Sequence, residues 1–289
     1  MPTVRTSRRD FLRVTAMGTA GVVFAPHVSG RPAMPATTIQ HSQGELKLGV
    51  ASYSLRAFSR ADAIKMIQAL NTPFVNIKSF HLPYESTPEE LALGRREFEE
   101  TGLRIVGGGN NNITEDTDDH VRMFFEYGKR CGMPLLVIAP KPEILPRIEK
   151  FVKEYDIKVA IHNHGPEDQY FPAPKDALQH IKKMDPRVGL CVDVGHTTRT
   201  GADIVQALAE AGDRVLDMHM KDLKDLMVKE SQCIVGEGAM PVPEIFAQLL
   251  RIKYSGYVNL EYEIDKDNPL PGMQQSFAYM RGVLAGLAI

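Results

Sequence analysis

Histidines and carboxylates follow several short apolar stretches in the second half of this sequence. They are His162 and His164 in VAIHNHG, Asp193 and His196 in LCVDVGH, His219 in VLDMHMKD, and Glu261 in YVNLEYE. A single histidine after an apolar run is more often hydrogen-bonded structure than a ligand, but here four separate runs carry such groups. Imidazole nitrogens and carboxylate oxygens are common ligands of catalytic divalent metals. The pattern therefore indicates a metal site, provided that the fold brings the four runs together.

Side-chain alternation along a strand selects which of these residues share a face. If VAIHNHG ends a strand, His162 and His164 point to one side and Asn163 points to the other. By the same rule, His219 and Lys221 share a face. Alternation therefore predicts that both histidines of VAIHNHG face the same site.

An earlier apolar run, FVNIK, ends in Lys78, and His81 follows it closely. A lysine that is close to a cation and partly removed from water has a lowered pKa and can move protons. Lys78 and His81 are therefore candidates for a proton-handling group beside the metal. A salt-bridged or solvated lysine is an equal alternative for Lys78.

The elements that must position these groups alternate regularly along the chain. Expected strands cover 47–53, 74–78, 103–106, 135–139, 158–161, 189–193, 215–220 and 257–261, and expected helices cover 60–70, 87–101, 116–131, 143–155, 174–183, 201–211, 242–251 and 273–287. Nearly continuous apolar strands between amphipathic helices indicate a parallel sheet that helices cover. Eight such units predict an α/β fold, a (β/α)8 TIM barrel in a single domain, with an open doubly wound sheet as the alternative. In a barrel the carboxyl ends of the strands meet at one rim, where active sites lie.

Composition sets limits on the class of protein. The chain has 289 residues, a formal net charge of -2 and three scattered cysteines. This charge gives no reason to expect nucleic acid as a partner, and the cysteines are too few for a disulfide framework or a thiolate metal cluster. The length suits one large core, so we expect the barrel to cover residues 39–289.

The first 38 residues have the pattern of an export signal. Arg8 and Arg9 precede an apolar, small-residue run over 14–25 and a segment rich in Pro and Ala. A twin arginine before a weakly apolar segment is typical of a Tat signal peptide, and an amphipathic helix with a chance arginine pair is the alternative. The run is too short for an ordinary membrane span. We expect residues 1–38 to be a signal peptide and linker, and the mature protein to be periplasmic or otherwise exported, without a membrane span.

From about Lys47 to the C-terminus, the sequence resembles the xylose isomerase-like TIM-barrel superfamily of sugar isomerases, epimerases, inosose dehydratases and endonuclease IV. The segments that carry the resemblance are CVDVGH, DMHMKD, VGEGAMPVPEIFAQLL and YSGYVNLEYE. The resemblance implies one divalent metal ion, Mn²⁺, Mg²⁺, Co²⁺ or Zn²⁺, held by residues of strands five to eight. Carried over, the ligands are His162, Asp193, His219 and Glu261. His162 departs from the family pattern, because the family usually has a glutamate there.

The resemblance also implies contacts with a small sugar or glycoside. The expected substrate-binding residues are His81, His164, Asp168 (with Glu167 as its alternative), His196, Lys221 and Glu237. For Glu237, which lies between two glycines, simple turn chemistry explains the pattern equally well. Glu261 and Lys78 are the expected catalytic residues. An assembly of several copies is compatible with the sequence.

The first functional hypothesis is a metal-dependent sugar isomerase or epimerase that removes a proton next to a carbonyl while the metal stabilises the enediolate. A metal-bound imidazole cannot also accept a proton, so if His162 is a ligand, a scheme in which two metal-bound glutamates exchange the proton is excluded. The second hypothesis is therefore a metal-dependent lyase or hydratase that performs β-elimination on 3-keto-glycosides or other keto-sugars. A third hypothesis, phosphodiester cleavage like that of endonuclease IV, would need more metal ligands and a basic groove. Neither is evident in the sequence, so this hypothesis is disfavoured. The alternative to an enzyme is a non-catalytic periplasmic barrel that binds sugars.

Overall fold

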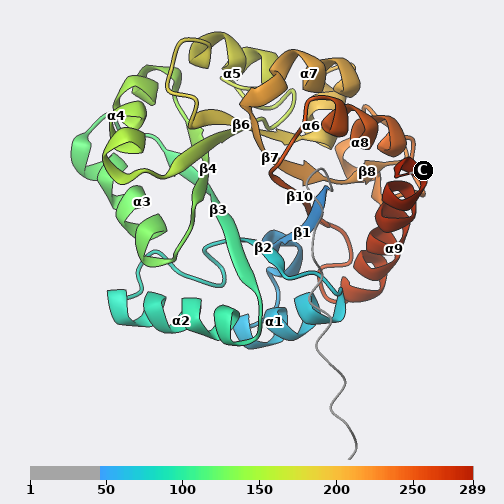
Figure 1. Cartoon of the computed structure of the whole chain (residues 1–289), viewed down its shortest axis with the longest axis horizontal. Helices are drawn as coiled ribbons and strands as arrows, with labels where there is room; N and C mark the ends of the chain where they lie inside the picture. Colours follow the sequence, from blue (N-terminus) through green and yellow to red (C-terminus); the bar gives the residue numbers. More distant parts are fainter. Residues whose placement is uncertain (1–45, 289) are drawn as a thin grey trace, which may run out of the picture. The chain divides into compact units, whose positions relative to one another are not determined.

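Eight parallel strands form a closed barrel in the computed structural model, which describes residues 46–288 (Figure 1). The strands are β1 (Lys47–Ala51), β2 (Phe74–Ile77), β3 (Arg104–Ile113), β4 (Leu135–Pro140), β5 (Lys158–His162), β6 (Val188–Asp193), β7 (Val215–Met220) and β10 (Tyr257–Leu260). Their order around the barrel is β1-β10-β7-β6-β5-β4-β3-β2, which closes on β1. The prediction of a (β/α)8 TIM barrel is confirmed.

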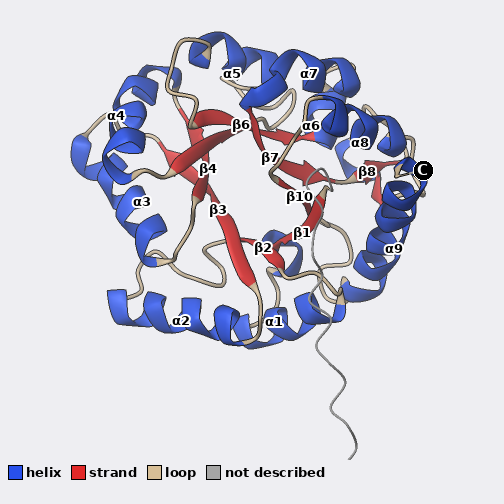
Figure 2. Ribbon diagram, in the orientation of Figure 1, coloured by secondary structure: helices blue, strands red, loops and turns tan. Residues whose placement is uncertain are grey.

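Helices surround the ring of strands (Figure 2). They are α1 (Arg60–Ala69), α2 (Pro88–Glu100), α3 (Asp118–Arg130), α4 (Leu145–Tyr155), α5 (Pro174–Ile181), α6 (Val194–Arg199), α7 (Ile204–Ala211), α8 (Val242–Arg251) and α9 (Leu270–Leu287). Local sequence sets the start of α2, where the Thr87 hydroxyl accepts from the Glu90 N–H, the Glu90 carboxylate accepts from the Thr87 N–H, and Pro88 takes the first helical position. Such a capping box satisfies two amides that a helix end would otherwise leave unpaired.

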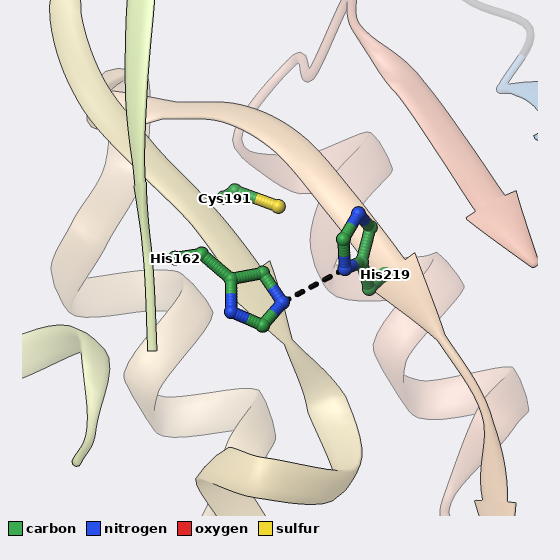
Figure 3. A group of neighbouring side chains, drawn as sticks. All are labelled: His162, Cys191 and His219. Atoms are coloured by element: carbon green, nitrogen blue, oxygen red, sulfur yellow. Dashed lines mark hydrogen bonds between the residues drawn. The ribbon is translucent and has the colours of Figure 1, made fainter. Parts of the chain in front are cut away.

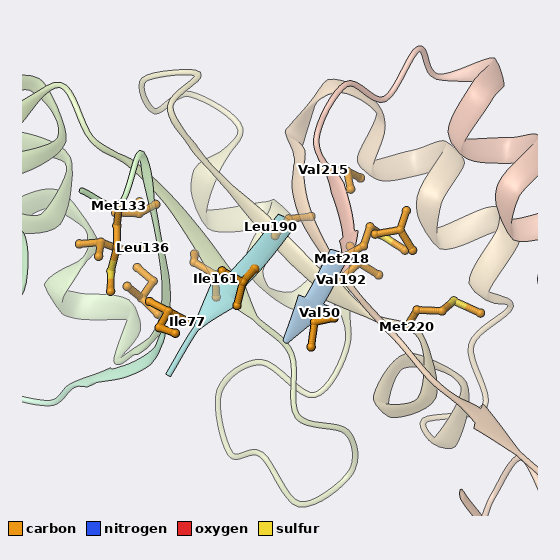
Figure 4. Packing of buried hydrophobic residues seen from close by; sticks show 14 of the residues in the cluster. Val50, Ile77, Met133, Leu136, Ile161, Leu190, Val192, Val215, Met218 and Met220 are labelled. Atoms are coloured by element: carbon orange, nitrogen blue, oxygen red, sulfur yellow. The ribbon is translucent and has the colours of Figure 1, made fainter. Parts of the chain in front are cut away.

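The main hydrophobic core lies between the helices and the outer face of the strands (Figure 4). On β5, Val159 and Ile161 belong to this core, whereas Ala160 belongs to a smaller cluster with Leu135 and Cys191. Full burial of such an aliphatic side chain stabilises the fold by about 1.5–3 kcal/mol. Because neighbouring residues alternate between the two faces, the same pattern that buries Ile161 outward turns His162 into the barrel.

A polar layer crosses the barrel interior below the strand ends. The Asp217 carboxylate accepts hydrogen bonds from the Asn76 amide at 2.6 Å and from the Asn259 amide at 2.7 Å. Burial raises the pKa of Asp217 to about 6. Gly49 makes room for this layer, since a Cβ added there would lie 2.4 Å from Asn259 Oδ1.

Three local features differ from the elements expected from the sequence. Strand β3 continues to Ile113 instead of ending near Val106, and α6 begins directly after β6. The strands β8 (Asp222–Leu223) and β9 (Gln232–Cys233) form an additional two-stranded sheet. The β8–β9 sheet lies in the segment between β7 and α8, which follows the carboxyl end of β7, where the candidate site lies.

The twin-arginine segment lies outside the described residues. The signal peptide, its boundary at residue 38 and export to the periplasm therefore stay predictions. Within residues 46–288, none of the helices combines the length and the apolar character that crossing a membrane requires.

Candidate metal centre and its cavity

Four potential metal ligands from four neighbouring strands meet inside the rim of the barrel. His162 ends β5, Asp193 ends β6, His219 lies on β7 and Glu261 follows β10, and all four side chains are buried. His162 Nε2 lies 2.8 Å from His219 Nδ1 and 3.7 Å from Asp193 Oδ2, and His219 Nδ1 lies 3.3 Å from Glu261 Oε2. Figure 3 shows the two imidazoles facing each other, with Cys191 beside them. The sequence-predicted ligands are thus brought together as one group.

The spacing of these atoms fits a divalent cation. Ligand atoms about 2.1 Å from a metal lie roughly 3–3.4 Å from one another, and one donor atom from each of the four residues can be chosen within 4.8 Å of the others. Two neutral imidazoles with two carboxylates are a donor set that Zn²⁺, Mn²⁺ and similar ions accept. His162, Asp193, His219 and Glu261 would hold such an ion.

Cys191 is close enough to the two histidines to count as a further donor. Burial, together with the neighbouring Asp217 carboxylate, raises the pKa of the Cys191 thiol well above its usual range. Metals bind the thiolate, so the four-residue set with its two carboxylates is the better site.

Buried lysines balance the charge of the carboxylates. Lys221 Nζ lies 2.9 Å from Asp193 Oδ2 and 3.1 Å from Glu261 Oε2, and it also pairs with Glu263. Burial alone would lower the pKa of Lys221, but these carboxylates outweigh it and raise the pKa well above its usual range. Lys78 Nζ lies 3.6 Å from Glu261 Oε1. Burial alone would raise the pKa of Glu261, but His219, Lys221 and Lys78 hold it well below its usual range.

Asp193 links the site to the start of α6. Its Oδ1 accepts a hydrogen bond from the His196 N–H at 2.8 Å, which caps the helix, while Oδ2 faces His162. Asn163 Oδ1 accepts from the Asp193 N–H at 3.0 Å, and the Asn163 amide donates to Thr197 Oγ1 at 3.0 Å. Asn163 therefore braces β6 and α6 from the face opposite His162, as expected from alternation.

The loop after β5 is held in a defined conformation. His164 Nδ1 lies 3.3 Å from Asp168 Oδ2, and Asp168 Oδ1 accepts from the N–H groups of Tyr170 and Phe171. Gly165 has φ +82°, and a Cβ there would lie 3.1 Å from a guanidinium nitrogen of Arg199. The positive φ favours glycine at this position, and a side chain there would also crowd the Arg199 guanidinium.

A cavity of about 720 Å³ opens above the metal centre. Its lining includes seven of the residues expected at the site: Lys78, His162, His164, Asp168, His196, His219 and Glu261. The cavity thus brings three of the six expected substrate-binding residues, His164, Asp168 and His196, together with the metal-ligand candidates and Lys78.

The other three expected substrate contacts do not line this cavity. His81 is 1% exposed, and its Nδ1 lies 3.1 Å from Ser52 Oγ because the chain turns back after β2. Lys221 lines an adjoining cavity of about 200 Å³. Glu237 is exposed, while the N–H groups on either side of it, from Gly236 and Gly238, donate to the Asp222 carboxylate. Turn chemistry thus accounts for the GEG segment, and Lys221 is a counterion of the buried carboxylates.

Several residues around the cavity were not found by sequence reasoning. They include Tyr53, Phe80, Asn110, Asn112, Tyr170 and Lys229. Among them, Asn110 contacts an expected site residue directly, since its amide nitrogen lies 2.9 Å from His164 Nε2. The unusual run GGGNNN was the available signal, but β3 was expected to end before it.

Comparison with known proteins agrees with this architecture. A family model described as xylose isomerase-like TIM barrel matches residues 143–283. An inosose dehydratase of Lactiplantibacillus plantarum is 28% identical over 148 residues, which are 44% of this chain and 48% of that protein. The chain thus spans about half the length of the inosose dehydratases that it matches.

Solved structures extend the likeness of fold to most of the chain. A D-psicose 3-epimerase, crystallised in the presence of D-fructose, has a TM-score of 0.68 and 17% identity over 83% of this chain and 100% of its own. The IOLI protein, described with a binding zinc atom, has a TM-score of 0.69 and 17% identity over 83% of this chain and 99% of its own. The chain therefore has a closed (β/α)8 TIM-barrel fold within residues 46–288, and its residues 143–283 are similar in sequence to the xylose isomerase-like TIM barrel family.

Proposed function

We propose that this protein is a metal-dependent lyase that performs β-elimination on keto-sugars. The observation that carries the proposal is the position of Glu261. Of the two carboxylates in the donor set, Glu261 lines the cavity and Asp193 does not, and Lys78 stands beside Glu261 at 3.6 Å. One carboxylate and one ammonium group therefore meet a substrate from the same side.

Epimerisation by two bases needs proton-accepting groups on opposite faces of the reacting carbon. The place that would supply the second carboxylate holds His162, and as a ligand this imidazole has no free lone pair. Chemistry on a single face remains, which suits elimination or aldose–ketose isomerisation. The similarity to inosose dehydratases supports elimination, because a dehydratase removes water.

The proposed reaction balances with groups that line the cavity. Glu261 accepts the proton from the carbon next to the ketone, and the electron pair of that C–H bond forms a C=C bond. The C–O bond on the next carbon breaks, and the departing oxygen takes a proton from Lys78 and leaves as an alcohol or water. Proton transfer from Glu261 to Lys78 then restores both groups. When bound, the metal would polarise the ketone oxygen and stabilise negative charge beside it.

This chemistry also limits the substrate. A leaving group on C1 of a sugar is β to a carbonyl only when the carbonyl is at C3. The proposed substrates are therefore 3-keto-glycosides, or cyclic ketones with a hydroxyl group two carbons from the carbonyl carbon.

The test is to incubate the metal-loaded protein with methyl 3-keto-β-D-glucoside and, separately, with D-fructose. We expect release of methanol with formation of an unsaturated ketone, and no change in the ketose. Glu261→Gln and Lys78→Met should each lower kcat by at least about a hundredfold, as removal of a general acid or base usually does. Lys65→Met, which changes an exposed lysine of α1, is the matched control. Interconversion of ketoses without release of methanol would instead establish an isomerase or epimerase.

A further inference from the structure

Three aromatic side chains line the mouth of the cavity within the described part of the chain: Tyr53, Phe80 and Tyr170. Phe80 is 55% exposed and Tyr170 is 36% exposed. Large apolar side chains left open to water around a pocket commonly mark a binding surface. The metal centre consists of charged and polar groups, whereas the exposed rings are mainly apolar.

The aromatic residues stand on opposite sides of the mouth. Tyr53 follows β1 and Phe80 follows β2, whereas Tyr170 lies in the loop after β5. In the barrel, β3 and β4 separate β2 from β5 on one side, and β10, β7 and β6 separate β1 from β5 on the other. A flat group at the mouth would therefore have an aromatic wall on each side.

The ring of Tyr53 and the backbone of Tyr170 are held in place before any ligand binds. The Arg56 guanidinium stacks on the Tyr53 ring at 4.5 Å and donates to the Tyr53 carbonyl at 3.1 Å and to the Glu263 carbonyl at 2.8 Å. The Tyr53 and Phe80 ring centroids are 5.8 Å apart. On the other wall, the Asp168 carboxylate accepts from the Tyr170 N–H at 2.8 Å. Rings that are already ordered lose little conformational entropy on binding.

The cavity is also larger than a single sugar requires. Pockets of roughly 300–1,000 Å³ hold drug-sized ligands, and this cavity measures about 720 Å³. Polar groups that line the cavity, such as His164 and Asn110, suit a sugar ring. The volume beyond that of one sugar leaves room for a second ring beside the aromatic side chains.

We propose that Tyr53, Phe80 and Tyr170 form a subsite for a flat aromatic aglycone, so that the natural substrate is an aryl glycoside. The identity of the reacting end rests on the proposed elimination, whereas the subsite itself does not. An aromatic ring between the two walls would stack against faces or edges of Tyr and Phe, as such rings do in proteins.

The test measures binding of phenyl β-D-glucoside and methyl β-D-glucoside by calorimetry. Neither compound has a ketone, so neither can undergo the proposed elimination. We expect the phenyl glucoside to bind at least about tenfold more tightly, which corresponds to about 1.4 kcal/mol. Phe80→Ala and Tyr170→Ala should each reduce this preference, and the double variant should reduce it to about twofold or less.

Tyr279→Ala is the matched control, because Tyr279 is a 38% exposed tyrosine on α9 that does not line the cavity. It should keep the full preference for the phenyl glucoside, and thermal unfolding should show all variants folded. Equal affinities for the two glucosides, no binding of the phenyl glucoside, or an unchanged preference in the double variant would each overturn the subsite. A preference for the phenyl glucoside without methanol release from the 3-keto-glucoside would keep the subsite and reject the elimination.

Discussion

Replacement of Lys221 by methionine should destabilise the metal-free protein far more than the metal-loaded protein. Lys221 lies 2.9 Å from Asp193 and 3.1 Å from Glu261, deep inside the barrel. Methionine has a similar length but no charge. The variant removes the Lys221 ammonium from both carboxylates and leaves Glu261 with Lys78 alone. A divalent cation would return positive charge to the same two groups.

The magnitude follows from these distances. With an effective dielectric constant of about 20, each of the two pairs has a gross attraction of about 5 kcal/mol. Removing the ammonium from water offsets several kcal/mol of that attraction, and loss of one partner of a buried ion pair typically costs about 3–5 kcal/mol. We expect a loss in that range without metal and a loss about 2 kcal/mol smaller with metal. By linkage, the variant should then bind metal about thirtyfold more tightly.

The assay is urea denaturation of Lys221→Met and wild type, each in chelator and in saturating Mn²⁺, with calorimetric titration of the metal. Lys65→Met, at an exposed lysine of α1, controls for the general effect of removing a lysine. An equal loss of stability with and without Mn²⁺ would refute the reasoning, because Lys221 and the metal would then not share the carboxylates.

Other predictions test the metal centre, the barrel interior and the surface. Chelation should lower Tm, and free metal at about 100 times Kd should add about 2.7 kcal/mol to the free energy of unfolding; an unchanged Tm would contradict the site. His162→Glu should lower the rate of elimination at least about tenfold, because it alters the ligand set, and full activity in a steady-state assay would argue against His162 as a ligand. Gly49→Ala should cost about 1–3 kcal/mol in urea denaturation, because its Cβ would meet Asn259 Oδ1 at 2.4 Å. The Arg187 side chain holds the pKa of Asp185 below its usual range, so Asp185 stabilises the fold above about pH 4 and loses that effect as the pH falls below it. Asp185→Asn should therefore lower Tm at pH 7 but much less at pH 2.5; an equal loss at both would count against this ion pair.

The barrel was predictable because strand and helix periodicities alternate from residue 47 to residue 287. The placement of His162 and His219 inside the rim follows from the same alternation, since the neighbours Ile161 and Met218 belong to the outer core. The alternation also predicted that Lys221 shares a strand face with His219, but it did not predict which carboxylates Lys221 pairs with. A shared face limits where a side chain points, whereas its contacts depend on the register between strands, which the sequence pattern does not contain.

Two departures have identifiable physical reasons. Strand β3 runs through GGGNNN, and a glycine- and asparagine-rich segment lacks the apolar pattern by which strands are recognised. His81 was expected at the cavity because it follows a strand, but its N–H donates to the Lys78 carbonyl at 3.0 Å in a turn, and its side chain packs near Ser52. Short-range turn geometry, rather than position along the chain, decides which side chains reach the rim.

The two carboxylate oxygens of Asp193 have separate structural roles, and this restricts which substitutions the protein can accept. One oxygen caps α6 and the other faces the ligand group, so a substitution that moves either oxygen disturbs a helix and a metal ligand in the same step. His162, by contrast, carries no helix cap, and a change there alters the chemistry while the backbone stays supported. We expect lineages of this barrel to diversify their reactions through the end of β5, with the end of β6 held fixed.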